Sequence, residues 1–243
     1  MFGTFLKNRC NWLNFAILLG LLALSFGCTY QSGEPVDQDP VTRKFTWFSY
    51  LDGGDIRNEC SGASPLQVRA VYNGVYDEQV RTYDVRPRAG EEGAYDLSVR
   101  VIGEADLSEM RVEGWANLLD PWRGKDVKTI LRQEDAGLLV RALKADGAMG
   151  PSPQGMELHS DDFYWIVSGC IEGQNVFHAY KWPEEPFVGA QFSGLLQSWD
   201  MTGVPVNPPR KVFDVDDPTR RPKETRSDFQ VRVGENGLWG IGR

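Results

Sequence analysis

The chain has 243 residues, of which 41% are hydrophobic and 25% are charged, and its formal net charge is −8. These values are typical of a globular protein and exclude collagen-like, low-complexity and fully disordered chains. The acidic balance argues against a general binder of nucleic-acid phosphates, which needs a basic stripe, so we expect no nucleic-acid partner. The four cysteines are too few for a disulfide scaffold and lack the paired spacing of a zinc site.

The N-terminus has the order of residues that is typical of a secretory signal peptide. Lys7 and Arg9 precede an unbroken apolar run over residues 15–26, which a glycine and a cysteine close. Even extended back to Trp12 the apolar run stays shorter than the roughly twenty residues that a membrane-spanning helix needs. The sequence therefore predicts a cleaved signal peptide over residues 1–27, and a retained membrane anchor is the alternative.

The end of this run, residues 24–28 (LSFGC), resembles the lipobox of bacterial lipoproteins. In that family the chain is cleaved before the cysteine, after diacylglycerol has been attached to its sulfur, so the resemblance implies that Cys28 carries lipid and that the membrane is a partner. Phe26 departs from the small or aliphatic residue usual at its position, and ordinary signal cleavage near Gly27 is the alternative. Thr29 rather than aspartate follows the cysteine, which by the same resemblance favours the periplasmic face of the outer membrane over the inner membrane.

After cleavage and lipidation, two cysteines would remain that can form a disulfide with each other. Removing residues 1–27 leaves 216 residues, lowers the net charge from −8 to −10 and discards Cys10. With Cys28 carrying lipid, Cys60 and Cys170 remain as a pair in an oxidising compartment. The sequence predicts a disulfide between them, and two separate buried thiols are the alternative.

The chain after the signal peptide is predicted to have three parts. Residues 28–40 are polar and contain two prolines, which indicates a lipidated cysteine followed by a flexible tether. Residues 41–203 form the predicted globular domain. Residues 204–243 form a Pro-rich, charged extension that ends in a hairpin or a loose tail.

Strand patterns dominate the first half of the predicted domain. Residues 44–51 are rich in aromatic side chains and read as a strand. A hairpin is predicted over residues 67–85, with Asn73-Gly74 supplying the positive φ angles of a type I′ turn. Residues 95–102 alternate cleanly between apolar and polar side chains. Weaker strand patterns lie at residues 110–115 and 127–131.

The second half adds helices. Residues 134–145 predict a helix whose apolar face holds Leu138, Leu139, Ala142 and Leu143. A second hairpin joins residues 163–170 to 175–182 at Glu172-Gly173, and residues 188–199 predict another amphipathic helix. This order predicts an α+β fold, with a single antiparallel sheet and about two helices packed on one face. A β-sandwich with peripheral helices is the alternative.

The sequence offers little catalytic chemistry. Ser160, His159 and Asp161 are adjacent in the chain, so they cannot form the nucleophile–base–orienter order of a catalytic triad. No metal-ligand spacing, phosphate-binding loop or dinucleotide motif occurs, so we expect no metal and no cofactor. A carboxylate pair of the glycosidase type stays open through Asp52, Asp55 and Glu78, although turn chemistry explains the first two.

Two features predict binding surfaces instead. Gln79, Arg81 and Tyr83 alternate along a strand, so their side chains project from one face of the sheet. Trp122 lies in a turn-rich stretch and is predicted to be exposed, where a tryptophan can stack on a sugar or anchor a protein partner. The alternatives are a solvated sheet face and ordinary packing.

The stretch VYNGVYDEQVR, residues 71–81, is also similar to sequences in uncharacterised proteobacterial envelope proteins. We therefore expect a lipid-anchored envelope lipoprotein, non-enzymatic, that binds a protein or glycan partner of the envelope. A periplasmic enzyme inhibitor and a glycan- or peptidoglycan-cleaving hydrolase with an Asp/Glu pair are the alternatives.

Overall fold

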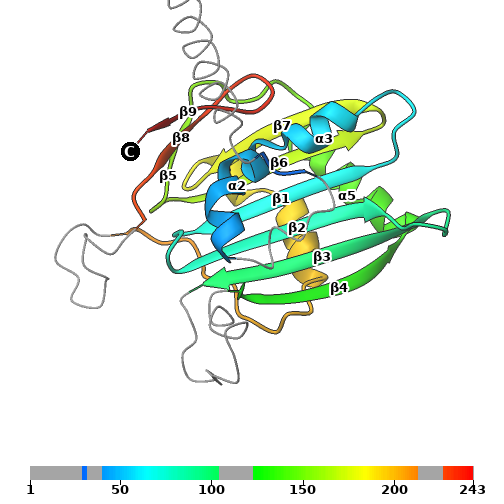
Figure 1. The fold of residues 1–243 in the computed structure, drawn as a ribbon, viewed down its shortest axis with the longest axis horizontal. Helices are drawn as coiled ribbons and strands as arrows, with labels where there is room; N and C mark the ends of the chain where they lie inside the picture. The colour runs from blue at the N-terminus through cyan, green and yellow to red at the C-terminus, as the bar shows by residue number, and fades with distance from the viewer. Residues whose placement is uncertain (1–28, 32–39, 104–122, 213–226, 243) are drawn as a thin grey trace, which may run out of the picture.

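The computed structural model describes residues 29–31, 40–103, 123–212 and 227–242. Within these residues the chain forms a six-stranded antiparallel sheet and a smaller three-stranded sheet, with helices on both faces of the larger one (Figure 1). The predicted α+β class is therefore confirmed. In the larger sheet the strands lie in the order β4 (Lys125–Arg132), β3 (Ala94–Gly103), β2 (Gln79–Pro87), β1 (Gln67–Gly74), β6 (Phe163–Ile171) and β7 (Gln174–Lys181). In the smaller sheet they lie in the order β5 (Glu157–His159), β8 (Gln230–Val233) and β9 (Leu238–Gly242).

One face of the larger sheet packs against two helices, as predicted. These are α5 (Gln133–Ala145) and α7 (Gln191–Ser198), preceded by the short α6 (Glu185–Val188). Trp165 lies at the centre of this core, and the rings of Tyr72, Tyr83 and Phe192 lie with their centroids 5.0, 5.8 and 5.4 Å from it. Three of the four residues on the predicted apolar face of α5 are buried, namely Leu139, Ala142 and Leu143. Leu138 is exposed, and Ala136 is buried in addition.

The opposite face is also covered, which the prediction of helices on one face missed. Helices α2 (Pro40–Asp52) and α3 (Gly54–Glu59) and the smaller sheet pack there around a second core. Trp47 and Leu51 of α2 meet Val231 of β8 in this cluster. In Figure 1 this layer faces the viewer, with α2 lying across β1 and β6. Burial on both faces explains why β6 is buried along its whole length rather than alternating between exposed and buried residues.

Residues 44–51 form part of a helix and not the predicted strand. The aromatic content suggested a strand, but the buried side chains of Trp47, Tyr50 and Leu51 follow the i, i+3, i+4 spacing of one helix face. The helix gives way to α3 at Gly53, whose φ of 66° is left-handed. A Cβ at Gly53 would lie 2.4 Å from the Cβ of Ser168, so the close approach of this turn to β6 also requires a glycine.

The first hairpin is present, but its turn is not at Asn73-Gly74. Both residues belong to β1, where Asn73 pairs with Val80, and the chain reverses over residues 75–78. The Asn73 side chain donates hydrogen bonds to the carbonyl oxygens of Ser160 (3.0 Å) and Asp162 (2.6 Å). Val75 takes the positive φ of 62° that was expected of the Asn-Gly pair. The tertiary hydrogen bonds of Asn73 thus outweigh its local preference for a turn, and the turn forms at residues 75–78 instead.

The other elements agree with the sequence patterns where the structure describes them. Strands β3 and β4, helix α5 and the β6–β7 hairpin are present, and Glu172-Gly173 forms the turn of that hairpin, with φ angles of 52° and 72°. The predicted helix over residues 188–199 is divided into α6 and α7 around Gly189-Ala190. The chain ends in the β8–β9 hairpin, and residues 110–115 lie outside the described ranges.

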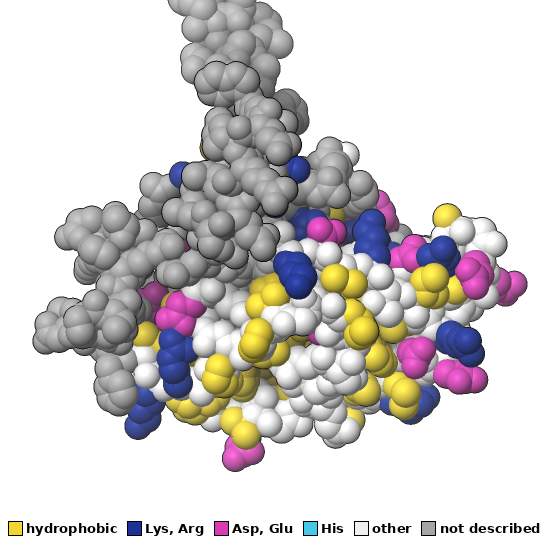
Figure 2. All heavy atoms as spheres, turned by 90° about the horizontal axis from the view of Figure 1, so that it is seen from below, with side chains coloured by type: hydrophobic (Ala, Val, Ile, Leu, Met, Phe, Trp, Pro, Cys, Tyr) yellow, Lys and Arg dark blue, Asp and Glu magenta, His cyan; other side chains and the backbone are white. Residues whose placement is uncertain are grey.

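The outer edge of the larger sheet is β4. Its cations Lys125, Lys128 and Arg132 are exposed, which discourages pairing with a further strand. Figure 2 views the molecule from this side and shows hydrophobic side chains spread among uncharged surface, with acidic and basic side chains at both ends of the view. Across the described ranges, no helix is both long and apolar enough to cross a membrane.

Candidate functional site

The predicted binding residues Gln79, Arg81 and Tyr83 do share one face of β2, but that face is buried. Arg81 is 1% exposed and Tyr83 is 0% exposed. The prediction that they form an exposed binding surface is therefore wrong. The physical reason is the segment after α7, residues 199–207, which crosses this end of the sheet and supplies hydrogen-bond partners for the polar side chains.

Arg81 holds that crossing segment in place. Its Nε donates to Oε1 of Gln79 (2.9 Å), and its terminal nitrogens donate to the Asp200 carboxylate and to the carbonyl oxygens of Val204 and Pro205. Asp200 also accepts hydrogen bonds from the hydroxyl of Tyr83 (3.1 Å) and from Thr202. Burial raises the pKa of Asp200, but the Thr202 hydrogen bonds and the Arg81 charge outweigh it, so its pKa is lowered overall. These residues stabilise the fold.

Two further predicted residues, Cys28 and Trp122, lie outside the described ranges. The predicted disulfide between Cys60 and Cys170 is present, with the two Cα atoms 5.5 Å apart. It ties the chain after α3 to β6 across 110 residues of sequence.

The carboxylates considered for a glycosidase pair are each bound to a different arginine. Asp52 pairs with Arg57 (2.7 Å), Asp55 with Arg69 (2.8 Å), and Glu78 with Arg210 (2.5 Å). The three carboxylates therefore lie in three different surroundings. No common site with two facing carboxylates results among them.

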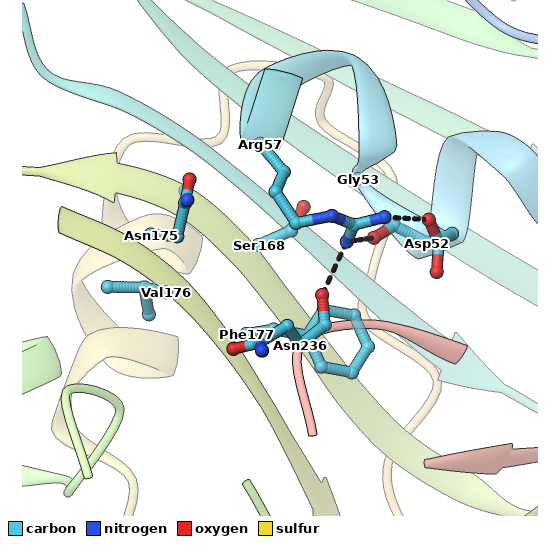
Figure 3. Close-up of a pocket in the computed structure, with 9 residues that line it drawn as sticks. Asp52, Gly53, Arg57, Ser168, Asn175, Val176, Phe177 and Asn236 are labelled. Carbon is cyan, nitrogen blue, oxygen red and sulfur yellow. Dashed lines mark hydrogen bonds and ion pairs between the residues drawn. The ribbon is translucent and has the colours of Figure 1, made fainter. Parts of the chain in front are cut away.

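The pair Asp52–Arg57 lines a small pocket, drawn in Figure 3. Arg57 reaches from α3 to Asp52 and to the carbonyl oxygen of Asn236 in the β8–β9 connection, while Asp52 accepts a hydrogen bond from the backbone N–H of Leu238 (2.7 Å). The pocket has a volume of about 10 Å³, which is room for one water molecule. We interpret it as a structural joint that fastens the β8–β9 hairpin to α2 and α3.

A buried charge cluster lies between α2, α3 and the sheet, and we call it the Arg69 cluster. Arg69 is fully buried; two of its nitrogens bind the two oxygens of Asp55 (2.9 and 2.8 Å), and its Nε binds Asp84 (2.9 Å). The Tyr50 hydroxyl donates to the other oxygen of Asp84. The Tyr30 ring lies with its centroid 4.7 Å from the Arg69 guanidinium, a cation–π contact. Burial, and then the Asp84 charge, raise the pKa of Tyr30 to about 12.

A groove of about 560 Å³ lies at the end of the sheet where β6 starts and β7 ends. We call it the β5–β7 groove. Its wall comes from the β5–β6 turn, the end of β7 and the C-terminal segments, so it combines residues distant in sequence. The lining residues are His159, Ser160, Asp161, Asp162, Phe163, Lys181, Trp182, Pro183, Arg210, Val212 and Asp228.

The β5–β6 turn is fixed by its own hydrogen bonds. The carboxylate of Asp162 accepts from the backbone N–H of His159 (2.9 Å), and the backbone N–H of Asp162 returns a bond to the His159 carbonyl (3.0 Å). Lys181, at the end of β7, pairs with the same carboxylate (2.8 Å) and donates to the Glu157 carbonyl (2.8 Å). The acidic side of the groove is therefore held rigidly against the sheet.

The other wall carries a cation and an aromatic ring. The Arg210 guanidinium lies 5.5 Å from the centre of the Phe163 ring and pairs with Glu78. Trp182 is half-buried, with its ring edge-on to Phe163 at 6.3 Å between centroids. Donors, carboxylates and an aromatic face thus surround one space, and its volume is in the range of small-ligand sites.

The serine that lines the groove, Ser160, is not placed to act as the nucleophile of a hydrolase. Ser160 is buried, and its Oγ accepts a weak hydrogen bond from the backbone N–H of Phe229 (3.5 Å). Among the described residues, no cluster of three or more histidine, cysteine or acidic side chains is arranged to hold a metal ion. The arrangement is suited to binding a polar ligand through charge-assisted hydrogen bonds and ring stacking.

No protein-family profile, curated protein or solved structure matches this chain.

Sequence reasoning missed the groove because its walls come from four separate segments. A local signal does exist for one wall: the run His159-Ser160-Asp161-Asp162 is a polar cluster between two strand patterns, and Lys181-Trp182 follows the second. The Arg69 cluster had a weaker signal, a single cation between the apolar residues Val68 and Ala70. A charged side chain that is buried with its apolar neighbours needs an oppositely charged partner, but the sequence does not show which residue that partner is.

Proposed function

We propose that this chain is a non-enzymatic bacterial lipoprotein, anchored through acylated Cys28 at the periplasmic face of the outer membrane, that binds an envelope ligand in the β5–β7 groove. The single observation that carries the binding function is the groove itself, with carboxylates, cations and Trp182 around about 560 Å³.

Two independent features support an envelope location. The N-terminal residues have the signal-peptide order that ends in Gly27-Cys28. The Cys60–Cys170 disulfide is the kind of bond that persists in an oxidising compartment such as the periplasm and is rare in the cytosol. The net negative charge also argues against nucleic acid as a partner, because the phosphate backbone is negative as well.

The groove chemistry favours a ligand that presents sugars and charged peptide ends together. Lys181 and Arg210 can bind carboxylates, while Asp161 and Asp228 can bind ammonium groups. A sugar ring can stack on the indole of Trp182. Peptidoglycan carries all of these groups, namely amino sugars, carboxylates and a free amine in its peptide stems, so it is the first ligand to test.

The location is tested by mass spectrometry of the N-terminal peptide of protein taken from the membrane fraction. We expect a peptide that begins at Cys28 and carries diacylglycerol on its sulfur. The Cys28→Ala variant should lose this peptide and accumulate as uncleaved precursor. An unmodified Cys28 in the native protein would contradict the lipoprotein proposal.

The binding function is tested by cosedimentation of the lipid-free domain with purified peptidoglycan. Arg210→Gln removes a groove cation, and Lys211→Gln removes the exposed neighbouring cation, which does not line the groove. One charge-assisted hydrogen bond contributes about 1.5–3 kcal/mol, so Arg210→Gln should raise the Kd by about tenfold or more, and Lys211→Gln should leave it unchanged. Equal affinities for both variants would exclude the groove as the binding site.

A further inference from the structure

Tyr30, which lies close to the predicted lipid attachment site, is built into the folded domain. Its side chain is 5% exposed, and its ring lies edge-on to Tyr50 with 4.9 Å between centroids. The same ring contacts the Arg69 guanidinium at 4.7 Å. The backbone N–H of Tyr30 donates to Oγ of Ser49 in α2 (2.8 Å). Tyr30 is therefore held by α2 from one side and by the Arg69 cluster from the other.

This position leaves almost no spacer between the lipid and the domain. Cys28 precedes Tyr30 by two residues, with Thr29 between them. An extended chain covers at most about 3.3–3.6 Å per residue, so the Cα atom of Cys28 lies within about 7 Å of that of Tyr30. Residues 32–39 follow Tyr30 and cannot lengthen this connection. The predicted tether over residues 28–40 is thus reduced to Thr29 as a spacer.

The surface of α2 near this point is apolar and basic. Phe45 and Val41 are 67% and 51% exposed, and they lie four residues apart, on one side of the helix. Lys44 is exposed beside them. Phe45 precedes Ser49, the partner of Tyr30, by four residues, a rise of about 6 Å along the helix axis. In Figure 1, α2 lies on the outside of the layer that faces the viewer.

We propose that the exposed side of α2 lies on the phospholipid bilayer, with Phe45 and Val41 inserted at the boundary between headgroups and acyl chains and Lys44 at the lipid phosphates. The inference rests on the lipidation of Cys28 in the proposed function. Acyl chains attached two residues from Tyr30 must enter the bilayer beside α2, which brings this apolar stripe to the membrane surface. A helix that presents aromatic and aliphatic side chains next to a lysine is the kind that binds in the plane of the interface.

The contact also orients the domain. The larger sheet separates α2 from α5 and α7, so those two helices face away from the membrane when α2 lies on it. The domain is then fixed on its anchor instead of rotating freely on a long tether.

The test places an environment-sensitive fluorophore at two exposed positions of the full lipidated protein in phosphatidylethanolamine–phosphatidylglycerol vesicles. Phe45→Cys labels the proposed contact, and Gln197→Cys labels α7 on the other side of the sheet as the matched control. Mass spectrometry first verifies the acyl chains on Cys28. We expect emission at position 45 to shift to shorter wavelength on vesicles and to be quenched by spin-labelled lipid, while position 197 shows neither change.

Two results would overturn the inference while the lipoprotein proposal stands. One is an unshifted label at position 45 in protein whose Cys28 is acylated, since the domain would then stand off the bilayer. The other is an equal shift at positions 45 and 197. An unacylated Cys28 would instead refute the proposed function itself, so the two failures are distinguishable.

A second pair of variants tests the positioning role of Tyr30. Tyr30→Ala removes the ring that fastens the anchor to α2, and the spacer lengthens toward residue 40. The shift at position 45 should then be lost. Tyr30→Phe keeps the ring over Arg69 and should keep the shift. Circular dichroism and the Cys60–Cys170 linkage check that both variants are folded; a retained shift in folded Tyr30→Ala would contradict the positioning role.

Discussion

Replacing Arg81 by methionine should destabilise the fold strongly. The guanidinium is buried, and its partners are the carboxylate of Asp200, the amide oxygen of Gln79 and two backbone carbonyls of the crossing segment. Methionine fills a similar volume but provides no donor. The substitution therefore leaves a buried carboxylate without its counter-ion and the Val204 carbonyl without the hydrogen bond from Arg81. The Gln79 amide oxygen and the Pro205 carbonyl each keep one other donor.

The expected loss in the free energy of unfolding is about 3–5 kcal/mol, the range for breaking a buried ion pair by removing one partner. Asp200 keeps its hydrogen bonds from Thr202 and Tyr83, which favours the lower half of this range. At a urea slope of about 3 kcal/mol per M, the unfolding midpoint should fall by about 1–1.7 M.

Urea unfolding at pH 7, followed by tryptophan fluorescence, measures this loss. Trp165 lies in the adjoining core, so its fluorescence contributes to the signal that changes on unfolding. The matched control is Arg141→Met, which removes an exposed arginine from α5 and should change stability by less than about 0.5 kcal/mol. Combining Arg81→Met with Asp200→Leu should recover part of the loss, because no unpaired charge stays buried.

A loss below about 1 kcal/mol in Arg81→Met would refute this account of the crossing segment. Apolar packing, and not the Arg81–Asp200 pair, would then hold residues 199–207 on the sheet.

Three further predictions concern other parts of the fold. Replacing Cys60 and Cys170 by serine should lower the free energy of unfolding by about 4–5 kcal/mol, the chain-entropy estimate for a loop of this length. Urea unfolding of this variant and of the disulfide-bonded protein measures the loss, and equal midpoints would contradict the prediction. Gly53→Ala should destabilise by more than about 1–2 kcal/mol in the same urea assay, since the left-handed φ and the Ser168 side chain both oppose a Cβ. Gly90→Ala has only the strain of its φ of 78° and should destabilise less. Burial lowers the pKa of His178, and the hydrogen bond to the Ala179 carbonyl raises it less, so NMR titration should find a value below the unfolded 6.5. The stability that neutral His178 contributes is therefore present above pH 6.5 and is lost as the pH falls through its folded pKa, and a folded pKa above 6.5 would reverse this sign.

Local patterns in the sequence were sufficient for the elements whose interactions are close along the chain. The β6–β7 hairpin follows from two strand patterns around Glu172-Gly173, and α5 follows from apolar residues at helical spacing. The Cys60–Cys170 pairing followed from elimination in an oxidising compartment, and the structure confirms it. For the hairpin and the helix, the interactions that select the structure lie within one short stretch of chain. The disulfide joins residues 110 apart in the sequence, and it could be predicted only because the chain has few cysteines.

Tertiary contacts decided the elements where local preference and burial disagreed. Residues 44–51 have the composition of a strand, but a helix places Trp47, Tyr50 and Leu51 together on the second core. Asn73 has the preference for a turn, yet its amide satisfies two carbonyl oxygens of the β5–β6 turn. Burial of apolar area, and the hydrogen bonding of polar groups that are buried with it, outweigh propensities, which differ by only about 1 kcal/mol between residues.

The opening composition gave an acidic globular chain, and the N-terminal pattern added a predicted signal peptide and lipid on Cys28. The sequence by itself determined the α+β class and most of the strands. It could not show that Arg81 is covered, that Tyr30 docks between α2 and Arg69, or that distant segments enclose the β5–β7 groove. Those facts depend on which segments meet across the sheet, and such long-range contacts leave no periodic signal in either partner. Tertiary structure alone therefore decided where the candidate site lies and that Tyr30 packs against the folded domain.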